Sequence, residues 1–203
     1  MLDVSPSRER RAILSPDVRL AFAPSATYAQ LLEQAQPRLW QRVATAVLVI
    51  AVAAPIIAVQ RVTIGFVALT AVSWSFVVGI QATTGALVIA SARTRRIRMP
   101  HALDLWFAAH VPYTLWLLTS AVVLGSLPSA SADILIALAV VPSLWTAGIV
   151  SAFCRVVLGT TREGARLRAA AHFAIVWIIA LEYVAWSAGG WFQITRTIAR
   201  VFE

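Results

Sequence analysis

The sequence predicts an all-α integral membrane protein with about five transmembrane helices, and two observations carry this prediction. First, 60% of the 203 residues are hydrophobic and only 13% are charged, whereas soluble domains carry about 25% charged residues. A soluble fold of this size exposes too much surface to hide so many apolar side chains. Second, the apolar residues occur in runs of about 20, the length needed to cross a hydrocarbon core roughly 30 Å thick.

Residues 1–40 are expected to form a cytoplasmic segment that precedes the membrane domain. They contain no short apolar core followed by a cleavage site, so we expect the first span to act as the insertion signal. In "SATYAQLLEQAQPRLW", Thr27 and Gln30 have capping-box spacing, and apolar residues recur at helical spacing. This pattern predicts a short amphipathic helix ending near Pro37. The helix would lie at the membrane surface or pack on the protein itself.

Residues 41–192 are expected to form the membrane domain, followed by a C-terminal tail at 193–203. The apolar runs place the five spans at about 42–59, 63–91, 103–125, 133–157 and 170–191. The second span is long enough to tilt strongly in the bilayer.

Prolines and small residues occur inside several of these spans. Pro55, Pro112 and Pro142 fall in three different spans, where neighbouring groups can satisfy the freed carbonyls, and we expect fixed kinks. "GIQATTGA" (79–86) and "GIVSA" (148–152) place small residues at helix-packing spacing. These stretches indicate contact between spans or between subunits.

The arginines predict the orientation of the chain. All 17 basic residues are arginine, which is typical of a GC-rich bacterial genome and favours the bacterial inner membrane. Loops rich in arginine stay on the cytoplasmic side, so the N-terminus is expected inside and the tail outside. The expected cytoplasmic anchors are Arg93, Arg95, Arg96, Arg98, Arg162, Arg166 and Arg168. Near anionic headgroups each arginine gains about 1 kcal/mol, and the lack of interleaved aromatic residues argues against nucleic acid.

Asp104, His110 and Glu182 are the candidate polar residues inside the membrane, where ionisable groups usually face a partner or a cavity. Asp104 could simply favour the positive N-terminus of its helix. His110 and His172 are weak candidates for haem ligands. We expect them at different depths, with His110 in a hydrogen bond between helices. Glu182, midway along the fifth span, would be protonated, paired or directed into a polar cavity.

No pattern in the sequence indicates catalysis. It contains no phosphate-binding glycine loop, no His-Glu-x-x-His pattern and no serine nucleophile elbow. Cys154 is the one cysteine, which excludes an intramolecular disulfide and a multi-cysteine metal site. We therefore expect no enzyme, no catalytic residue, no metal and no cofactor.

The layout resembles the YIP family (Ypt/Rab-interacting-protein-like membrane proteins), including its bacterial type. The matching stretches are "PSATYAQLLEQAQPRLW", "MPHALDLWFAAHVPYTLWLL" and "LWTAGIVSAFCRVVLGTTREGARLRAAAHF". Where the family often has a glycine pair in its central loop, this chain has "TRRIRMP". The resemblance implies five spans and a scaffold or membrane-organising role without catalytic residues.

Three functions follow as hypotheses. The leading one is a non-catalytic scaffold or accessory subunit that contacts the bilayer and other membrane subunits, with no nucleic-acid partner. The second is a small transporter or substrate-binding component that uses Glu182 and His110. The third is a haem- or quinone-binding membrane subunit.

Overall fold

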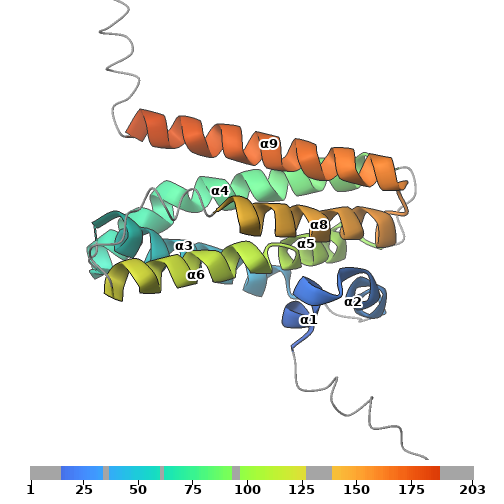
Figure 1. The fold of residues 1–203 in the computed structure, drawn as a ribbon, viewed down its shortest axis with the longest axis horizontal. Helices are drawn as coiled ribbons and strands as arrows, with labels where there is room; N and C mark the ends of the chain where they lie inside the picture. Colours follow the sequence, from blue (N-terminus) through green and yellow to red (C-terminus); the bar gives the residue numbers. More distant parts are fainter. Residues whose placement is uncertain (1–14, 34–36, 60–61, 93–96, 127–138, 188–203) are drawn as a thin grey trace, which may run out of the picture.

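The computed structural model describes residues 15–33, 37–59, 62–92, 97–126 and 139–187. In this part of the chain eight α-helices are connected by short segments (Figure 1). Their bounds are α1 Pro16–Phe22, α2 Pro24–Leu31, α3 Leu39–Val59, α4 Ile64–Ala90, α5 Met99–Ala108, α6 Val111–Ser126, α8 Val140–Val156 and α9 Arg162–Ser187.

Three helices, α3, α4 and α9, are long and apolar enough to cross a membrane. The pair α5 and α6 together forms a fourth candidate span, and α8 is a shorter apolar helix of 17 residues. Large apolar side chains face outward on these helices, with Val72 77% and Leu144 69% exposed. The chain is therefore an all-α membrane protein whose outer surface suits lipid.

The ends of the predicted spans agree with the structure for α3 and α4 and differ for α9. Thr63 caps α4, because its side chain accepts a hydrogen bond from the Phe66 amide. α9 begins at Arg162, eight residues before the predicted start at 170. The extra turns, "REGARLRA", are charged, so a search for apolar runs does not detect them. Residues 133–138 of the fourth predicted span and 188–191 of the fifth lie outside the described residues.

The third predicted span, 103–125, is present as two helices with a bend just before Pro112, where a kink was expected. It is broken between Ala108 and Val111, and the axes of α5 and α6 differ by 42°. Pro112 has no amide hydrogen to donate to the carbonyl of Ala108, and its ring crowds that carbonyl. The amides of Ala109 and His110 instead bond to carbonyls three residues back, which ends α5 in a tight turn.

The N-terminal helices α1 and α2 pack on the protein, and the sequence did not predict α1. Ser15 caps α1 by accepting a hydrogen bond from the Val18 amide. α2 begins at Pro24 without a side-chain cap, so the predicted capping box at Thr27 is wrong, and Thr27 is buried. Because Thr27 lies in the interior of the helix, its hydroxyl cannot bond to the free amides of the first turn.

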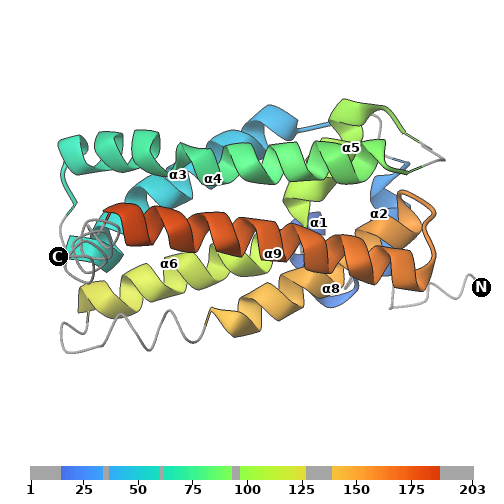
Figure 2. The ribbon, with the colours of Figure 1, turned by 90° about the horizontal axis from the view of Figure 1, so that it is seen from above.

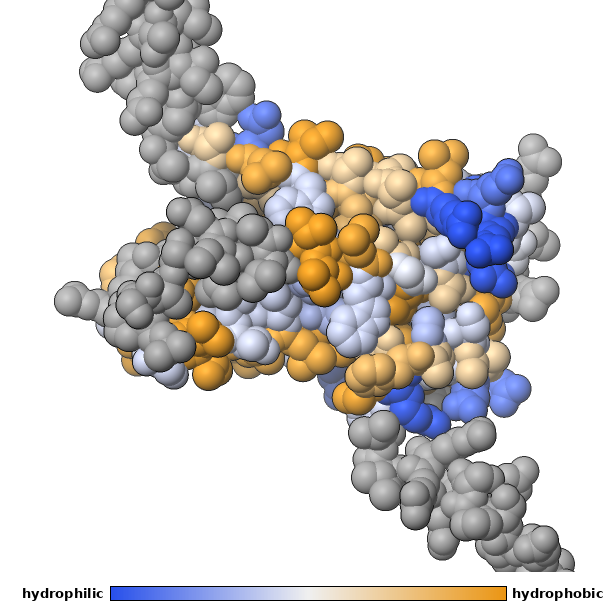
Figure 3. Space-filling view, viewed as in Figure 1, coloured by the Kyte–Doolittle hydropathy of each residue, from blue (hydrophilic) through white to orange (hydrophobic). Residues whose placement is uncertain are grey.

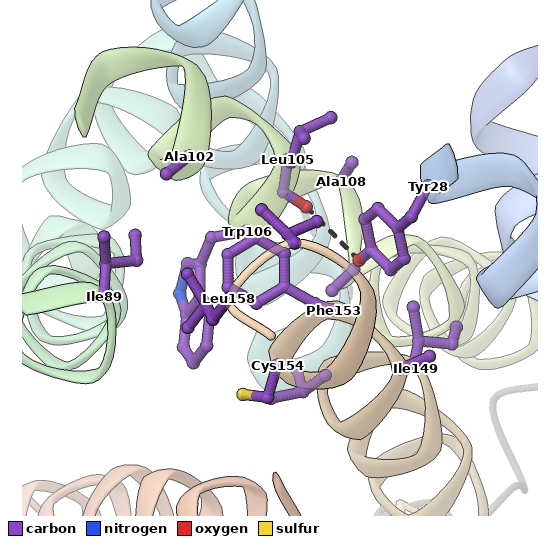
Figure 4. Close-up of a cluster of buried hydrophobic side chains, with 14 of the residues drawn as sticks. Tyr28, Ile89, Ala102, Leu105, Trp106, Ala108, Ile149, Phe153, Cys154 and Leu158 are labelled. Carbon is purple, nitrogen blue, oxygen red and sulfur yellow. Dashed lines mark hydrogen bonds between the residues drawn. The ribbon is translucent and has the colours of Figure 1, made fainter. Parts of the chain in front are cut away.

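Tyr28 fixes α2 to the membrane helices. Its hydroxyl donates to the carbonyl of Leu105 at 3.3 Å, and its ring packs edge-on against Phe153 of α8 (Figure 4). Burial raises the pKa of the Tyr28 phenol well above its ordinary value. The structure therefore shows this segment packed on the protein.

The long helices run back and forth along one axis, and α9 lies over α4 and α8 (Figures 1 and 2). Arg42 in the first turn of α3 binds Asp104 of α5, and Arg168 near the start of α9 binds Ser91 at the end of α4. The starts of α3, α5 and α9 and the end of α4 therefore meet at one end of the bundle. Around Trp106 the core side chains of α4, α5 and α8 converge (Figure 4).

Candidate functional site: a buried histidine pair

His110 and His172 meet inside the bundle. Their Nε2 atoms are 3.1 Å apart, and both residues are buried. His110 lies in the break between α5 and α6, eleven residues after Met99, and His172 lies ten residues after the start of α9. Because both helices start from the same end of the bundle, the two rings lie at the same depth.

The expectation that the histidines lie at different depths is therefore wrong. It depended on a fifth span that begins at 170, which places His172 at the membrane surface. With α9 beginning at Arg162, His172 lies about 15 Å along the helix. The hydrogen bond between helices that was expected of His110 is present.

Two further contacts extend the pair into a chain across three helices. Thr84 Oγ1 of α4 is 2.8 Å from His172 Nδ1, and His110 Nδ1 is 3.1 Å from the Trp106 carbonyl oxygen. Since that carbonyl can only accept, His110 must carry its proton on Nδ1. With both rings neutral, His110 Nε2 then accepts, His172 Nε2–H donates to it, and His172 Nδ1 accepts from the Thr84 hydroxyl.

This neutral arrangement satisfies the three contacts of the rings with one proton on each ring, and the single Thr84 hydroxyl proton then points to His172 Nδ1 instead of to the Ile80 carbonyl, which is also 2.8 Å away. If the hydrogen bond between the rings ran from His110 Nε2–H to His172 Nε2, a neutral His110 would have no proton on Nδ1, which faces a carbonyl oxygen. Only a His110 cation would carry protons on both nitrogens. A cation in this apolar interior would be costly. The contacts thus assign opposite tautomers to the two rings.

Trp106 forms the wall of the site. It is fully buried, its ring lies 4.7 Å from that of His172, and its Nε1–H donates to the carbonyl of Gln81 at 3.0 Å. A Cβ on Gly85 would lie 2.6 Å from Trp106 Nε1. The small-residue contact predicted for 79–86 is therefore made at Gly85, whereas Gly79 and Gly148 face open space.

Asp104 takes part in a second polar cluster at the end of the bundle. Arg42 Nε is 2.8 Å from Asp104 Oδ1, and Arg42 Nη1 is 2.7 Å from Asp17 Oδ1. Asp104 lies in the second turn of α5, beyond the first turn where the helix dipole acts. The negative charge of its carboxylate is balanced by Arg42. An ion pair that the sequence did not predict therefore stabilises Asp104, instead of the positive N-terminus of its own helix.

Glu182 is not part of either cluster. It is exposed on α9 and has no hydrogen bond or ion pair with another residue that the structure describes. It follows His172 by ten residues, about 15 Å along the helix. The structure therefore does not bring Glu182 to His110.

The predicted anchor arginines that the structure describes lie at one end of the bundle. Arg98 and Arg162 are exposed, as is Arg166, while Arg168 donates to the hydroxyl of Ser91 at 3.1 Å. Figure 3 shows hydrophilic residues gathered over the start of α9 and mainly apolar residues along the helices. Arg93, Arg95, Arg96 and the tail 193–203 lie outside the described residues.

The chemistry open to the histidine pair is limited by its contacts. Every ring nitrogen has a partner, and within the described ranges no group of three His, Cys, Asp or Glu side chains could hold a metal ion. Metal–nitrogen bonds of about 2.0 Å place two ligands on opposite faces of a metal about 4 Å apart. At 3.1 Å the rings leave no space for a haem between them.

Comparison with known proteins identifies no relative: no family model, no curated protein and no solved structure matches this chain.

Proposed function

We propose that this chain is a non-catalytic scaffold or accessory subunit of a larger complex in the bacterial inner membrane. The observation that carries the proposal is that two clusters of polar side chains bind one another, although Arg19 Nε, Trp116 Nε1 and Thr146 Oγ1 are buried without a partner among the described residues. His110, His172 and Thr84 join three helices, and Arg42 joins Asp17 and Asp104. Groups engaged in this way hold helices in place, and every ring nitrogen of the two histidines is occupied by a contact within the protein.

The arrangement of the arginines supports an orientation with this end of the bundle in the cytoplasm. The helix ends that carry Arg42, Arg98, Arg155 and Arg162 meet there, and arginine-rich ends are retained inside. The YIP-like layout, with a helical lead-in before several closely spaced spans, implies the same scaffold role.

The test is to extract the tagged chain from its own membranes in mild detergent and to measure the mass and composition of the particle. We expect other membrane subunits in a fixed ratio to this 21.9 kDa chain. Recovery of the chain alone, at every detergent concentration, would contradict the proposal.

Glu182→Gln provides the control for the transporter hypothesis. Because Glu182 lies on the outside and apart from His110, we expect this variant to keep the abundance and composition of the particle. Loss of proton-coupled uptake at unchanged protein level would support a transporter instead of a scaffold.

A further inference from the structure

A groove runs between α8 and α9 on the outside of the bundle. It has a volume of about 730 Å³, within the range of roughly 300–1,000 Å³ that binding sites for small ligands occupy. Its walls are mainly apolar, with Leu144 of α8 and Phe173 of α9 among them. The hydrogen bond from Trp177 Nε1 to Ser143 Oγ, 3.2 Å long, joins the two helices towards the far end.

Small residues make this groove. Ala147 and Gly148 of α8 face Ala169 and Ala170 of α9 across it. A Cβ on Gly148 would meet nothing within 4 Å. The space is therefore an unfilled part of the surface beside Gly148, and a larger side chain at this position would enter it.

Three arginines line the groove at the end of the bundle where α8 ends and α9 begins. They are Arg155 in the last turn of α8, and Arg162 and Arg166 in the first two turns of α9. Arg162 and Arg166 are four residues apart on one helix face, a spacing at which like charges repel. None of their three side chains makes a hydrogen bond or ion pair with another described residue, whereas the side chains of Arg42 and Arg168 do.

The groove therefore combines positive charge at one end with an apolar channel along the rest. From Arg155 to Ser143 the distance along α8 is about 18 Å. One leaflet of the hydrocarbon core is about 15 Å thick. A molecule with an anionic head and an apolar chain of that length matches both the charge and the extent of the groove.

We propose that the α8–α9 groove binds an anionic phospholipid. Its phosphate lies among Arg155, Arg162 and Arg166, and one acyl chain lies along Gly148 towards Trp177. The bound lipid neutralises the repulsion between the arginines and covers the gap that the small residues leave.

The test measures lipid binding to the full chain, purified in a non-ionic detergent and depleted of lipid, by native mass spectrometry. The probes are phosphatidylglycerol and phosphatidylcholine with identical acyl chains. We expect phosphatidylglycerol to bind more tightly. Each change among Arg155→Gln, Arg162→Gln and Arg166→Gln should weaken it about fivefold, and the triple variant about a hundredfold.

Two matched controls separate this site from general attraction to an arginine-rich surface. Arg98→Gln removes an exposed arginine at the same end but outside the groove and should leave binding unchanged. Gly148→Phe should block the acyl part, whereas Gly79→Phe, at an exposed glycine of α4 that also faces open space, should not. Circular dichroism spectra and thermal unfolding identify any variant that fails to fold.

Three outcomes would overturn the proposal. Equal binding of the two lipids would exclude a site for an anionic headgroup. Arginine variants that weaken binding while Gly148→Phe does not would place the lipid outside the groove. Conversion of a dimer to a monomer by Gly148→Phe, with lipid binding unchanged, would show that a second copy of the chain occupies the groove.

Discussion

Arg42 binds two carboxylates that belong to two other helices, and the two contacts differ in burial. The Asp104 side chain is 7% exposed and the Asp17 side chain 41%. Removing one partner of a buried ion pair leaves an uncompensated charge, whereas an exposed pair contributes about 0–1 kcal/mol. The contact with Asp104 therefore matters more to the fold.

Arg42→Met is expected to lower the free energy of unfolding by about 3–5 kcal/mol, because Asp104 stays buried without its counter-charge. The measurement is chemical unfolding of the purified protein in detergent. Asp17→Asn, the control, should cost less than about 1 kcal/mol. Adding Asp104→Asn to Arg42→Met should recover most of the loss, and an Arg42→Met protein as stable as the wild type would contradict the assigned ion pair.

The two histidine rings are expected to carry their protons on different nitrogens. The contact of His110 Nδ1 with a carbonyl places its proton there, and the direct contact with His172 then places the second proton on His172 Nε2. Nitrogen-15 NMR of the labelled imidazoles measures this directly. We expect an Nδ1–H tautomer for His110 and an Nε2–H tautomer for His172, and the same tautomer in both rings would refute the proton assignment.

At the scale of the elements, the fit between α4 and α5 depends on Gly85. The indole of Trp106 occupies the space that a Cβ would need, and the same indole borders His172. The small-residue pattern of the sequence indicated a close contact in this stretch but not which residue makes it.

Gly85→Ala is expected to destabilise the protein by about 1–3 kcal/mol, because the added methyl group forces a buried, hydrogen-bonded indole to move. Thermal unfolding in detergent compares it with Gly79→Ala on the same helix. Since nothing lies within 4 Å of a Cβ at Gly79, that change should be neutral or slightly stabilising. Equal effects at the two positions would contradict the packing described for Gly85.

The elements also show how far the sequence predicts this fold. Long apolar runs predicted α3 and α4 closely, because membrane thickness sets their length. The same criterion missed the charged first turns of α9, and it placed α5 and α6 in one span with a kink at Pro112 but could not give the 42° between their axes. Apolar periodicity detects which residues avoid water, and it contains no information about a helix that extends into water or about the direction of a bend.

The histidine pair was predicted only in part, for a related reason. His110 was identified as a residue that needs a partner inside the membrane. Its partner His172 is 62 positions away, and the match in depth depends on where α9 begins. The Arg42–Asp104 pair, also 62 positions apart, was missed because no spacing along one helix links residues so far apart in the sequence.

At the scale of the whole molecule, successive long helices run in opposite directions. The helix ends that carry the described arginines therefore lie together at one end of a mainly apolar bundle. The described arginines there include Arg98, Arg155 and Arg162. The opposite end, where α3 is followed by α4, has Val62 exposed. We propose that the arginine-rich end faces the cytoplasm, where retention of positive charge fixes the orientation of each span.

The orientation is tested most directly by cysteine labelling of intact and lysed spheroplasts with a membrane-impermeant maleimide. Cys154 is buried, and Cys154→Ala supplies a cysteine-free background for Val62→Cys, Arg98→Cys and Glu163→Cys, all at exposed positions. We expect Val62→Cys to react in intact spheroplasts, and Arg98→Cys and Glu163→Cys only after lysis. Reaction of Arg98→Cys or Glu163→Cys from outside, or of all three positions from one side, would contradict a membrane-spanning bundle with a cytoplasmic arginine-rich end.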